Sequence, residues 1–136
     1  MAHNDEVTMR MEGITKRFPG VLANDQISLD CRKGEVLGLL GENGAGKTTL
    51  MNILYGLHQP DSGEIFINGE PVKIESPAKA IQLGIGMVHQ HFMLVEALTA
   101  LENVIIGIPS EHAPVLDLAP ARRRLLNLCD EYGLHV

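Results

Sequence analysis

The sequence is poor in several residue types that often mark function. It has no tryptophan, three phenylalanines and two tyrosines, which leaves few candidates for stacking on a ligand. No window approaches the eighteen or more apolar residues of a membrane-spanning helix, and this excludes such a segment. The chain starts with acidic Asp5 and Glu6 where a secretory signal would be basic, so we expect no such signal.

Cysteine is also scarce. The two cysteines, Cys31 and Cys129, lie far apart, with no C-x-x-C pattern and no histidine at metal-ligand spacing. This usage favours two buried thiols in a reducing compartment over a disulfide framework. We therefore expect a cytoplasmic chain.

Basic residues are in the minority. Eleven Lys and Arg stand against seventeen Asp and Glu, for a formal net charge of −6. An acidic chain is a poor general binder of nucleic acid, because neutralising phosphates requires clustered basic side chains. The 136 residues suit one domain, and 45% hydrophobic residues argue against disorder. Glycine, at 14 residues, is well above the usual share of about 7%.

Periodicity predicts strands that pair as hairpins, followed by a strand–loop–helix unit. Alternating apolar residues indicate half-buried strands at residues 7–11 and 27–31. Asn68 and Gly69 predict a type I′ turn between strands 64–67 and 72–74. Continuous apolar runs at residues 36–40 and 85–88 predict short buried strands of a parallel sheet. Helical spacing or caps predict helices at residues 49–55, 77–83, 98–108 and 120–132.

The first buried run leads directly into a phosphate-binding pattern. Residues 41–48 read Gly-Glu-Asn-Gly-Ala-Gly-Lys-Thr and match G-x-x-x-x-G-K-[ST], with a strand before and a helix after. Glycines let successive N–H groups turn inward around an anion, and the helix adds its positive end. Lys47 supplies an ammonium for the β- and γ-phosphates, and the Thr48 hydroxyl is a ligand for Mg²⁺. The alternative is a glycine-rich turn that binds nothing.

The flanks of this loop resemble those of one family. Residues 41–50 are similar to the phosphate loop of ATP-binding-cassette (ABC) ATPases, and residues 86–94 resemble their Q-loop region. The family's other motifs occur in the family's order, at residues 14–20, 33–35, 60–63, 67–69 and 98–104. Within the family, the chain is most similar to importers of simple sugars or nucleosides.

The resemblance implies an α/β fold: a P-loop NTPase core with an antiparallel β subdomain and the beginning of a helical subdomain. It also implies the residues that bind ATP. These are Phe18, Gly41, Glu42, Asn43, Gly44, Ala45, Gly46, Lys47, Thr48, Thr49 and Gln90.

Two of these roles depend on the resemblance alone. Phe18 occupies the position of an aromatic that stacks on adenine; the alternative is a core phenylalanine at a strand end. Gln90 corresponds to the Q-loop glutamine, which reaches Mg²⁺ or the attacking water, so Thr48 and Gln90 are the expected metal ligands. The flanking His89 and His91 form an H-x-H pair, one pattern of zinc ligands, but no third ligand accompanies it.

The family's hydrolytic residues are absent from the sequence. It has no strand ending in the Mg²⁺-binding Asp of Walker B, no following catalytic Glu, no switch His and no Leu-Ser-Gly-Gly-Gln signature. Residues 1–136 are therefore expected to be the truncated, N-terminal part of a nucleotide-binding domain. Such a chain should bind ATP with Mg²⁺ but not turn it over, and it contains no catalytic residue.

The resemblance further implies a function and partners. It predicts the ATP-binding component of an importer that couples ATP binding and hydrolysis to uptake of a sugar or nucleoside. The expected partners are membrane-spanning permease subunits, contacted through the Q-loop region on the inner face of the membrane, and a second cassette in tandem or as a dimer. The alternatives are a non-transport ABC ATPase of translation or DNA repair, and a small P-loop phosphotransferase.

Overall fold

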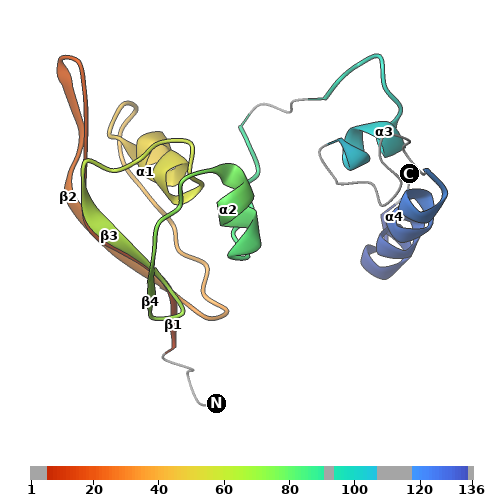
Figure 1. The fold of residues 1–136 in the computed structure, drawn as a ribbon, viewed down its shortest axis with the longest axis horizontal. Helices are drawn as coiled ribbons and strands as arrows, with labels where there is room; N and C mark the ends of the chain where they lie inside the picture. Colours follow the sequence, from red (N-terminus) through yellow and green to blue (C-terminus); the bar gives the residue numbers. More distant parts are fainter. Residues whose placement is uncertain (1–5, 91–93, 107–117, 135–136) are drawn as a thin grey trace. The chain divides into compact units, whose positions relative to one another are not determined.

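The computed structural model describes residues 6–90, 94–106 and 118–134. The chain divides into two compact units, Met1–Val88 and His89–Val136, and each is described by itself. The first unit contains a sheet and the helices α1 and α2, and the second contains α3 and α4 (Figure 1). None of the helices in the described ranges is long and apolar enough to cross a membrane.

The first unit is organised around a four-stranded antiparallel sheet in the order β2-β1-β3-β4. Its strands are β1 (Val7–Phe18), β2 (Val21–Arg32), β3 (Ser62–Ile67) and β4 (Glu70–Val72). The predicted hairpins are confirmed, although β1 and β2 are longer than the alternation indicated. The turn between β3 and β4 has positive φ at both central residues, 52° at Asn68 and 82° at Gly69, as a type I′ turn requires.

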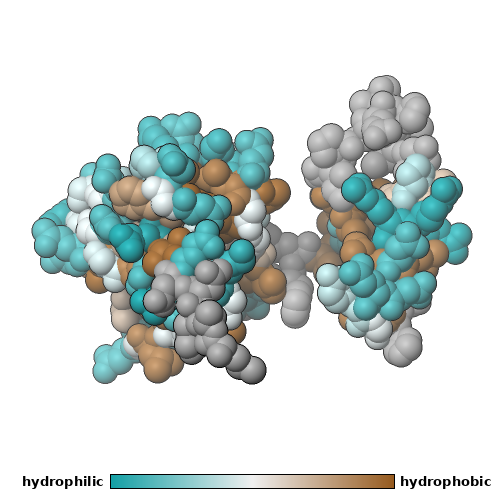
Figure 2. Space-filling model, turned by 90° about the horizontal axis from the view of Figure 1, so that it is seen from below, coloured by the Kyte–Doolittle hydropathy of each residue, from teal (hydrophilic) through white to brown (hydrophobic). Residues whose placement is uncertain are grey.

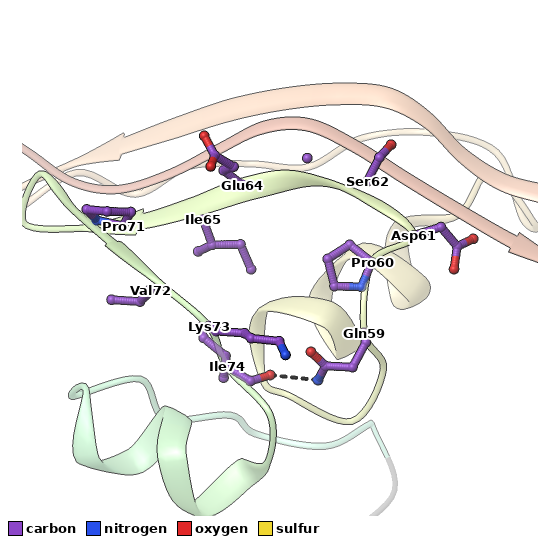
Figure 3. A pocket seen from close by; sticks show the side chains of 11 residues that line it. Gln59, Pro60, Asp61, Ser62, Glu64, Ile65, Pro71, Val72, Lys73 and Ile74 are labelled. Carbon is purple, nitrogen blue, oxygen red and sulfur yellow. Dashed lines mark hydrogen bonds between the residues drawn. The ribbon is translucent and has the colours of Figure 1, made fainter.

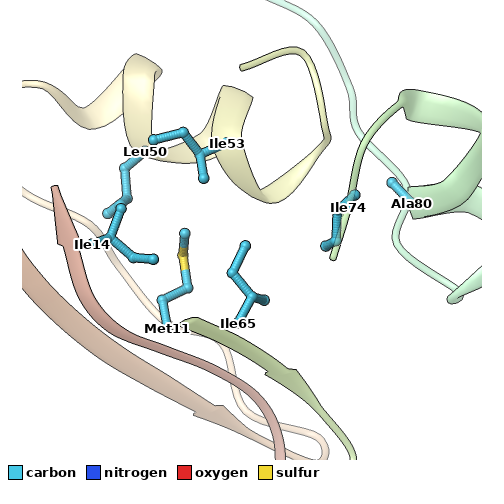
Figure 4. Packing of buried hydrophobic residues seen from close by; sticks show 7 residues of the cluster. All are labelled: Met11, Ile14, Leu50, Ile53, Ile65, Ile74 and Ala80. Atoms are coloured by element: carbon cyan, nitrogen blue, oxygen red, sulfur yellow. The ribbon is translucent and has the colours of Figure 1, made fainter. Parts of the chain in front are cut away.

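Helix α1 (Lys47–Leu54) packs one face on this sheet. Its Leu50 and Ile53 are buried against Met11 and Ile14 of β1 and Ile65 of β3 (Figure 4). Ile74 and Ala80 complete the cluster. Burying side chains of this size stabilises a fold by about 1.5–3 kcal/mol each. The core therefore fixes α1, and with it the position of the loop that precedes α1.

A carboxylate joins the segment before β3 to the end of β1. Asp61 accepts hydrogen bonds from the Lys16 ammonium at 2.8 Å and from the Arg17 backbone N–H at 2.6 Å. Its own N–H donates to the Thr15 carbonyl at 2.8 Å. The hydrogen bond from Lys16, followed by that from the Arg17 N–H, holds the pKa of Asp61 below its ordinary value.

This lowered pKa predicts a pH-dependent contribution of Asp61 to stability. The contribution is fully present above the unfolded pKa of about 3.9 and is lost as the pH falls through the lower folded pKa. We expect Asp61→Asn to lower the free energy of unfolding at pH 7, by a margin that narrows below pH ~4. Urea unfolding at several pH values measures it.

The control is Glu75→Gln, which removes the more exposed Lys73–Glu75 pair, whose side chains are 77% and 66% exposed. Its effect should be smaller, because exposed pairs contribute little. If the difference in the free energy of unfolding between wild type and Asp61→Asn stays constant from pH 7 to pH 2, the lowered pKa of Asp61 is contradicted.

Helices α2 and α3 begin at caps that the sequence contains. In α2 (Pro77–Gln82), which corresponds to the helix predicted at 77–83, the Ser76 hydroxyl accepts from the Lys79 N–H at 3.3 Å and caps the helix start. In α3 (Ala100–Ile105) Thr99 and Glu102 form a reciprocal capping box. Helix α4 spans Leu118–Tyr132. Helix α3 is shorter than the predicted 98–108, because the cap places its start after Thr99; residues 107 and 108 lie outside the described ranges.

Two predicted buried strands are wrong. Residues 36–40 and 85–88 adopt no strand, and Val36, Leu40 and Val88 are 97%, 94% and 87% exposed. A strand forms only where a neighbour accepts and donates its backbone hydrogen bonds, and the sheet seen among the described residues is the antiparallel one. Figure 2 shows hydrophobic surface on the face that it draws. The expectation of two buried cysteines is half correct, since Cys129 is buried and Cys31 is only half-buried.

Candidate nucleotide-binding site

The phosphate-binding pattern forms an exposed loop that ends at the N-terminus of α1. Gly44 and Gly46 have φ of 85° and 83°, in the left-handed region that favours glycine. The Ala45 N–H donates to the Glu42 carbonyl at 3.2 Å and closes a turn inside the loop. Gly46 is the N-cap of α1 and provides no side-chain cap. The first N–H groups of the helix are therefore left without a capping side chain, at the end where the helix dipole favours an anion.

The loop also approaches β2 closely. A Cβ atom on Gly46 would lie 2.0 Å from the Ala23 carbonyl oxygen and 2.8 Å from Nδ2 of Asn24. Glycine is thus required at position 46 by its backbone conformation and by the space beside β2.

Lys47 is folded over the loop that it follows. Its Nζ donates to the carbonyl oxygens of Gly41 and Glu42, both at 2.7 Å. A lysine ammonium has three N–H donors, so this arrangement keeps one donor for a further acceptor. The charge is held above the turn formed by residues 42–45, where backbone N–H groups and the end of α1 are also found. A polyphosphate suits this donor set.

The other predicted loop residues differ in exposure. Asn43 and Thr48 are exposed and Thr49 is half-buried. Mg²⁺ accepts a single protein oxygen when phosphate oxygens and water supply its other ligands. The exposed Thr48 hydroxyl, one residue after Lys47, fits that requirement.

Phe18 lies at the end of β1, and 37% of the residue is exposed. Its ring and the His58 ring pack edge to face, with their centroids 5.5 Å apart. Lys16 Nζ lies 5.6 Å from the centroid of the Phe18 ring. Lys16 pairs in register with Asn24, whose side chain contacts Gly46. The phenylalanine is therefore partly exposed, and it lies two residues along β1 from Lys16, the residue that pairs with Asn24.

Sequence reasoning missed Asn24 and His58. Asn24 gave no signal in the sequence, because it precedes the strand predicted at residues 27–31 and its burial, with only 4% of the residue exposed, comes from the fold. A residue at that inward position would ordinarily be apolar. His58 had no local signal, since its contact with Phe18 joins two distant segments.

Gln90 is exposed and belongs to the second unit, so its predicted role stays a prediction. His91 lies outside the described ranges.

A cavity of about 620 Å³ lies between β3, β4 and the segment before β3 (Figure 3). It is lined by Gln59, Pro60, Asp61, Ser62, Gly63, Glu64, Ile65, Pro71, Val72, Lys73 and Ile74. None of the phosphate-loop residues is among these. Gln59 donates to the Ile74 carbonyl at 2.8 Å and Asp61 is paired with Lys16, so two of its polar groups already have partners. We do not place the nucleotide there.

The sheet, the helix behind it and the glycine-rich loop define a nucleotide-binding cassette. Residues 24–135 match the model of the ABC transporter family, and the chain belongs to this family. The fold agrees with that assignment. An ATP-binding cassette of an ABC transporter in its ADP conformation superposes with a TM-score of 0.77 at 26% identity, over 94% of this chain and 54% of that one.

Curated relatives are import ATP-binding proteins. The chain is 52% identical to the nucleoside import ATP-binding protein NupA of Lactococcus lactis, over 97% of this chain and 26% of the relative. It is 56% identical to the glucose import ATP-binding protein TsgD13 of Haloferax volcanii, over 85% of this chain and 20% of that protein. The chain thus spans about a quarter of the length of these relatives.

Proposed function

We propose that this chain is the ATP-binding part of an ABC importer for a nucleoside or simple sugar. The observation that carries the proposal is the loop of residues 41–48, with two left-handed glycines and Lys47 held over it by the Gly41 and Glu42 carbonyls. Relatives named for nucleoside, guanosine, glucose and ribose import support the class of solute.

We propose that each group of the site holds a part of the nucleotide. Backbone N–H groups of Gly44 and of residues 46–48, together with the Lys47 ammonium, hold the β- and γ-phosphates, and the partly exposed ring of Phe18 receives the adenine ring. Mg²⁺, when bound, neutralises phosphate charge, and Thr48 supplies the hydroxyl that ligates it. These residues bind and orient the nucleotide but provide no base for an attacking water.

Calorimetric titration with Mg·ATP tests the proposal. We expect saturable binding at one site and no steady phosphate release by the 136-residue chain. Absence of binding by the folded chain would refute the proposal. Robust turnover would show that a hydrolytic group had been overlooked.

A substitution at Phe18 tests the placement of the base. Phe18→Ala should weaken ATP binding about fivefold, because one stacking contact contributes about 1 kcal/mol. It should leave the affinity for inorganic tripolyphosphate unchanged, and Phe18→Tyr should restore ATP binding. An equal loss for both ligands would place Phe18 outside the base site.

The family supplies the expected partners. We propose that Gln90 and its neighbours contact permease subunits at the inner face of the membrane, and that a second cassette completes the ATP site. A dimeric cassette bound to ADP and phosphate is among the similar structures, with a TM-score of 0.70 at 26% identity. Cross-linking of Gln90→Cys, in membranes that contain the permease, tests the first contact.

A further inference from the structure

The contact between β2 and the phosphate loop passes through one buried asparagine. Asn24 Nδ2 donates to the Gly46 carbonyl at 3.2 Å, and the Leu50 N–H donates to the same oxygen at 2.9 Å. The first bond joins the loop to the sheet and the second is the first hydrogen bond of α1. The carbonyl is thus held from two directions.

A β-bulge directs Asn24 toward the loop. The register runs from Ile14↔Ile27 to Lys16↔Asn24, so two steps along β1 face three along β2. The extra residue produces a φ of 50° at Gln26, whose N–H donates to Thr15 Oγ1 at 3.1 Å. A bulge re-aims the side chains beside it, and bulges are common next to functional sites.

Stability does not explain the choice of asparagine. Its Oδ1 is buried and has no hydrogen-bond partner among the described residues. A buried acceptor left unpaired destabilises the fold. The Gly46 carbonyl retains its bond from Leu50 without Asn24, so a leucine of similar size would satisfy the core and remove an unpaired group.

We propose that Asn24 is a positioning residue for phosphate binding, an inference that rests on the proposed nucleotide-binding function. In a trans peptide the carbonyl of Gly46 and the N–H of Lys47 point in opposite directions. Holding the carbonyl toward Asn24 and Leu50 therefore aims the Lys47 N–H out of the helix end, toward the anion. Asn24 touches no ligand and acts through the Gly46–Lys47 peptide.

The test is Asn24→Leu in the 136-residue chain, with Ser28→Ala as the control. Ser28 also lies on β2 and accepts a hydrogen bond, from the Gly13 N–H at 2.9 Å, but it is not part of the contact with the loop. We expect Asn24→Leu to weaken binding of both ATP and tripolyphosphate about tenfold, the equivalent of one hydrogen bond, while Tm stays equal or rises. Ser28→Ala should leave both affinities unchanged.

Amide hydrogen exchange in the nucleotide-free chain provides a second readout. Asn24→Leu should accelerate exchange at Leu50, because the Gly46 carbonyl is then held by one bond. Wild-type affinity with unchanged exchange would overturn the proposal. A fall in Tm that accounts for the whole loss of affinity would reduce Asn24 to a structural role and also overturn it.

These readouts separate the two proposals. A wild-type chain that binds no ATP refutes the nucleotide-binding function, while exchange at Leu50 still reports whether Asn24 holds the loop. If Asn24→Leu does not fold, Asn24→Ala takes its place with the same expected loss of affinity and the same exchange readout.

Discussion

Lys47→Ala is expected to abolish measurable binding of ATP, with an affinity loss of at least about 100-fold. The ammonium is the basic group held at the loop, and each charge-assisted hydrogen bond that it makes to a phosphate is worth about 1.5–3 kcal/mol. The substitution also removes the bonds to the Gly41 and Glu42 carbonyls, which join the end of the loop at Lys47 to its start. Calorimetric titration with ATP and with tripolyphosphate measures the loss.

Lys73→Ala is the matched control. It removes a lysine of the same unit that pairs with Glu75 at 2.9 Å and lies outside the phosphate loop. Its affinities should equal those of the wild type, which excludes a general effect of net charge. Retained ATP affinity in Lys47→Ala would remove the phosphate-loop assignment, and with it the proposed function.

Gly46→Ala is expected to have the largest effect on stability. The new Cβ would lie 2.0 Å from the Ala23 carbonyl oxygen, at a φ of 83° that already disfavours a side chain. The clashing atom is backbone within a paired strand, so relief requires β2 or the loop to move. We expect the free energy of unfolding to fall by about 3 kcal/mol or more, in the range of substitutions that overpack a core. Nucleotide binding should be lost with it.

Gly84→Ala separates the effect of the positive φ from the effect of the close contact with Ala23. Gly84 has the same φ, 83°, but nothing lies within 4 Å of the position that its Cβ would take. Its substitution should cost only the conformational part, about 1 kcal/mol. The difference between the two variants in urea unfolding then measures the packing of the loop against β2. Equal losses would show that this close approach is unimportant.

Local chemistry accounts for what could be predicted. The phosphate loop, the Asn68–Gly69 turn and the Ser76 cap each depend on residues within about eight positions of one another, so their geometry follows from the residue types alone. The motif order of the ABC family also lies in the sequence, and the family is confirmed by the match over residues 24–135. The predicted ligand roles of residues 41–49 follow from the same local pattern and stay predictions.

The pairing of distant segments was decided by the tertiary structure. The sequence of residues 36–40 specifies an apolar segment able to form a buried strand, but burial requires a neighbouring strand, and Val36 and Leu40 are exposed in its absence among the described residues. Likewise, His58 meets Phe18, and a bulge in β2 turns Asn24 onto the Gly46 carbonyl. The sequence by itself determined the glycine-rich loop of residues 41–48 and the helix that follows it. Only the fold decided which side chains support the loop, because those contacts join residues far apart in the chain.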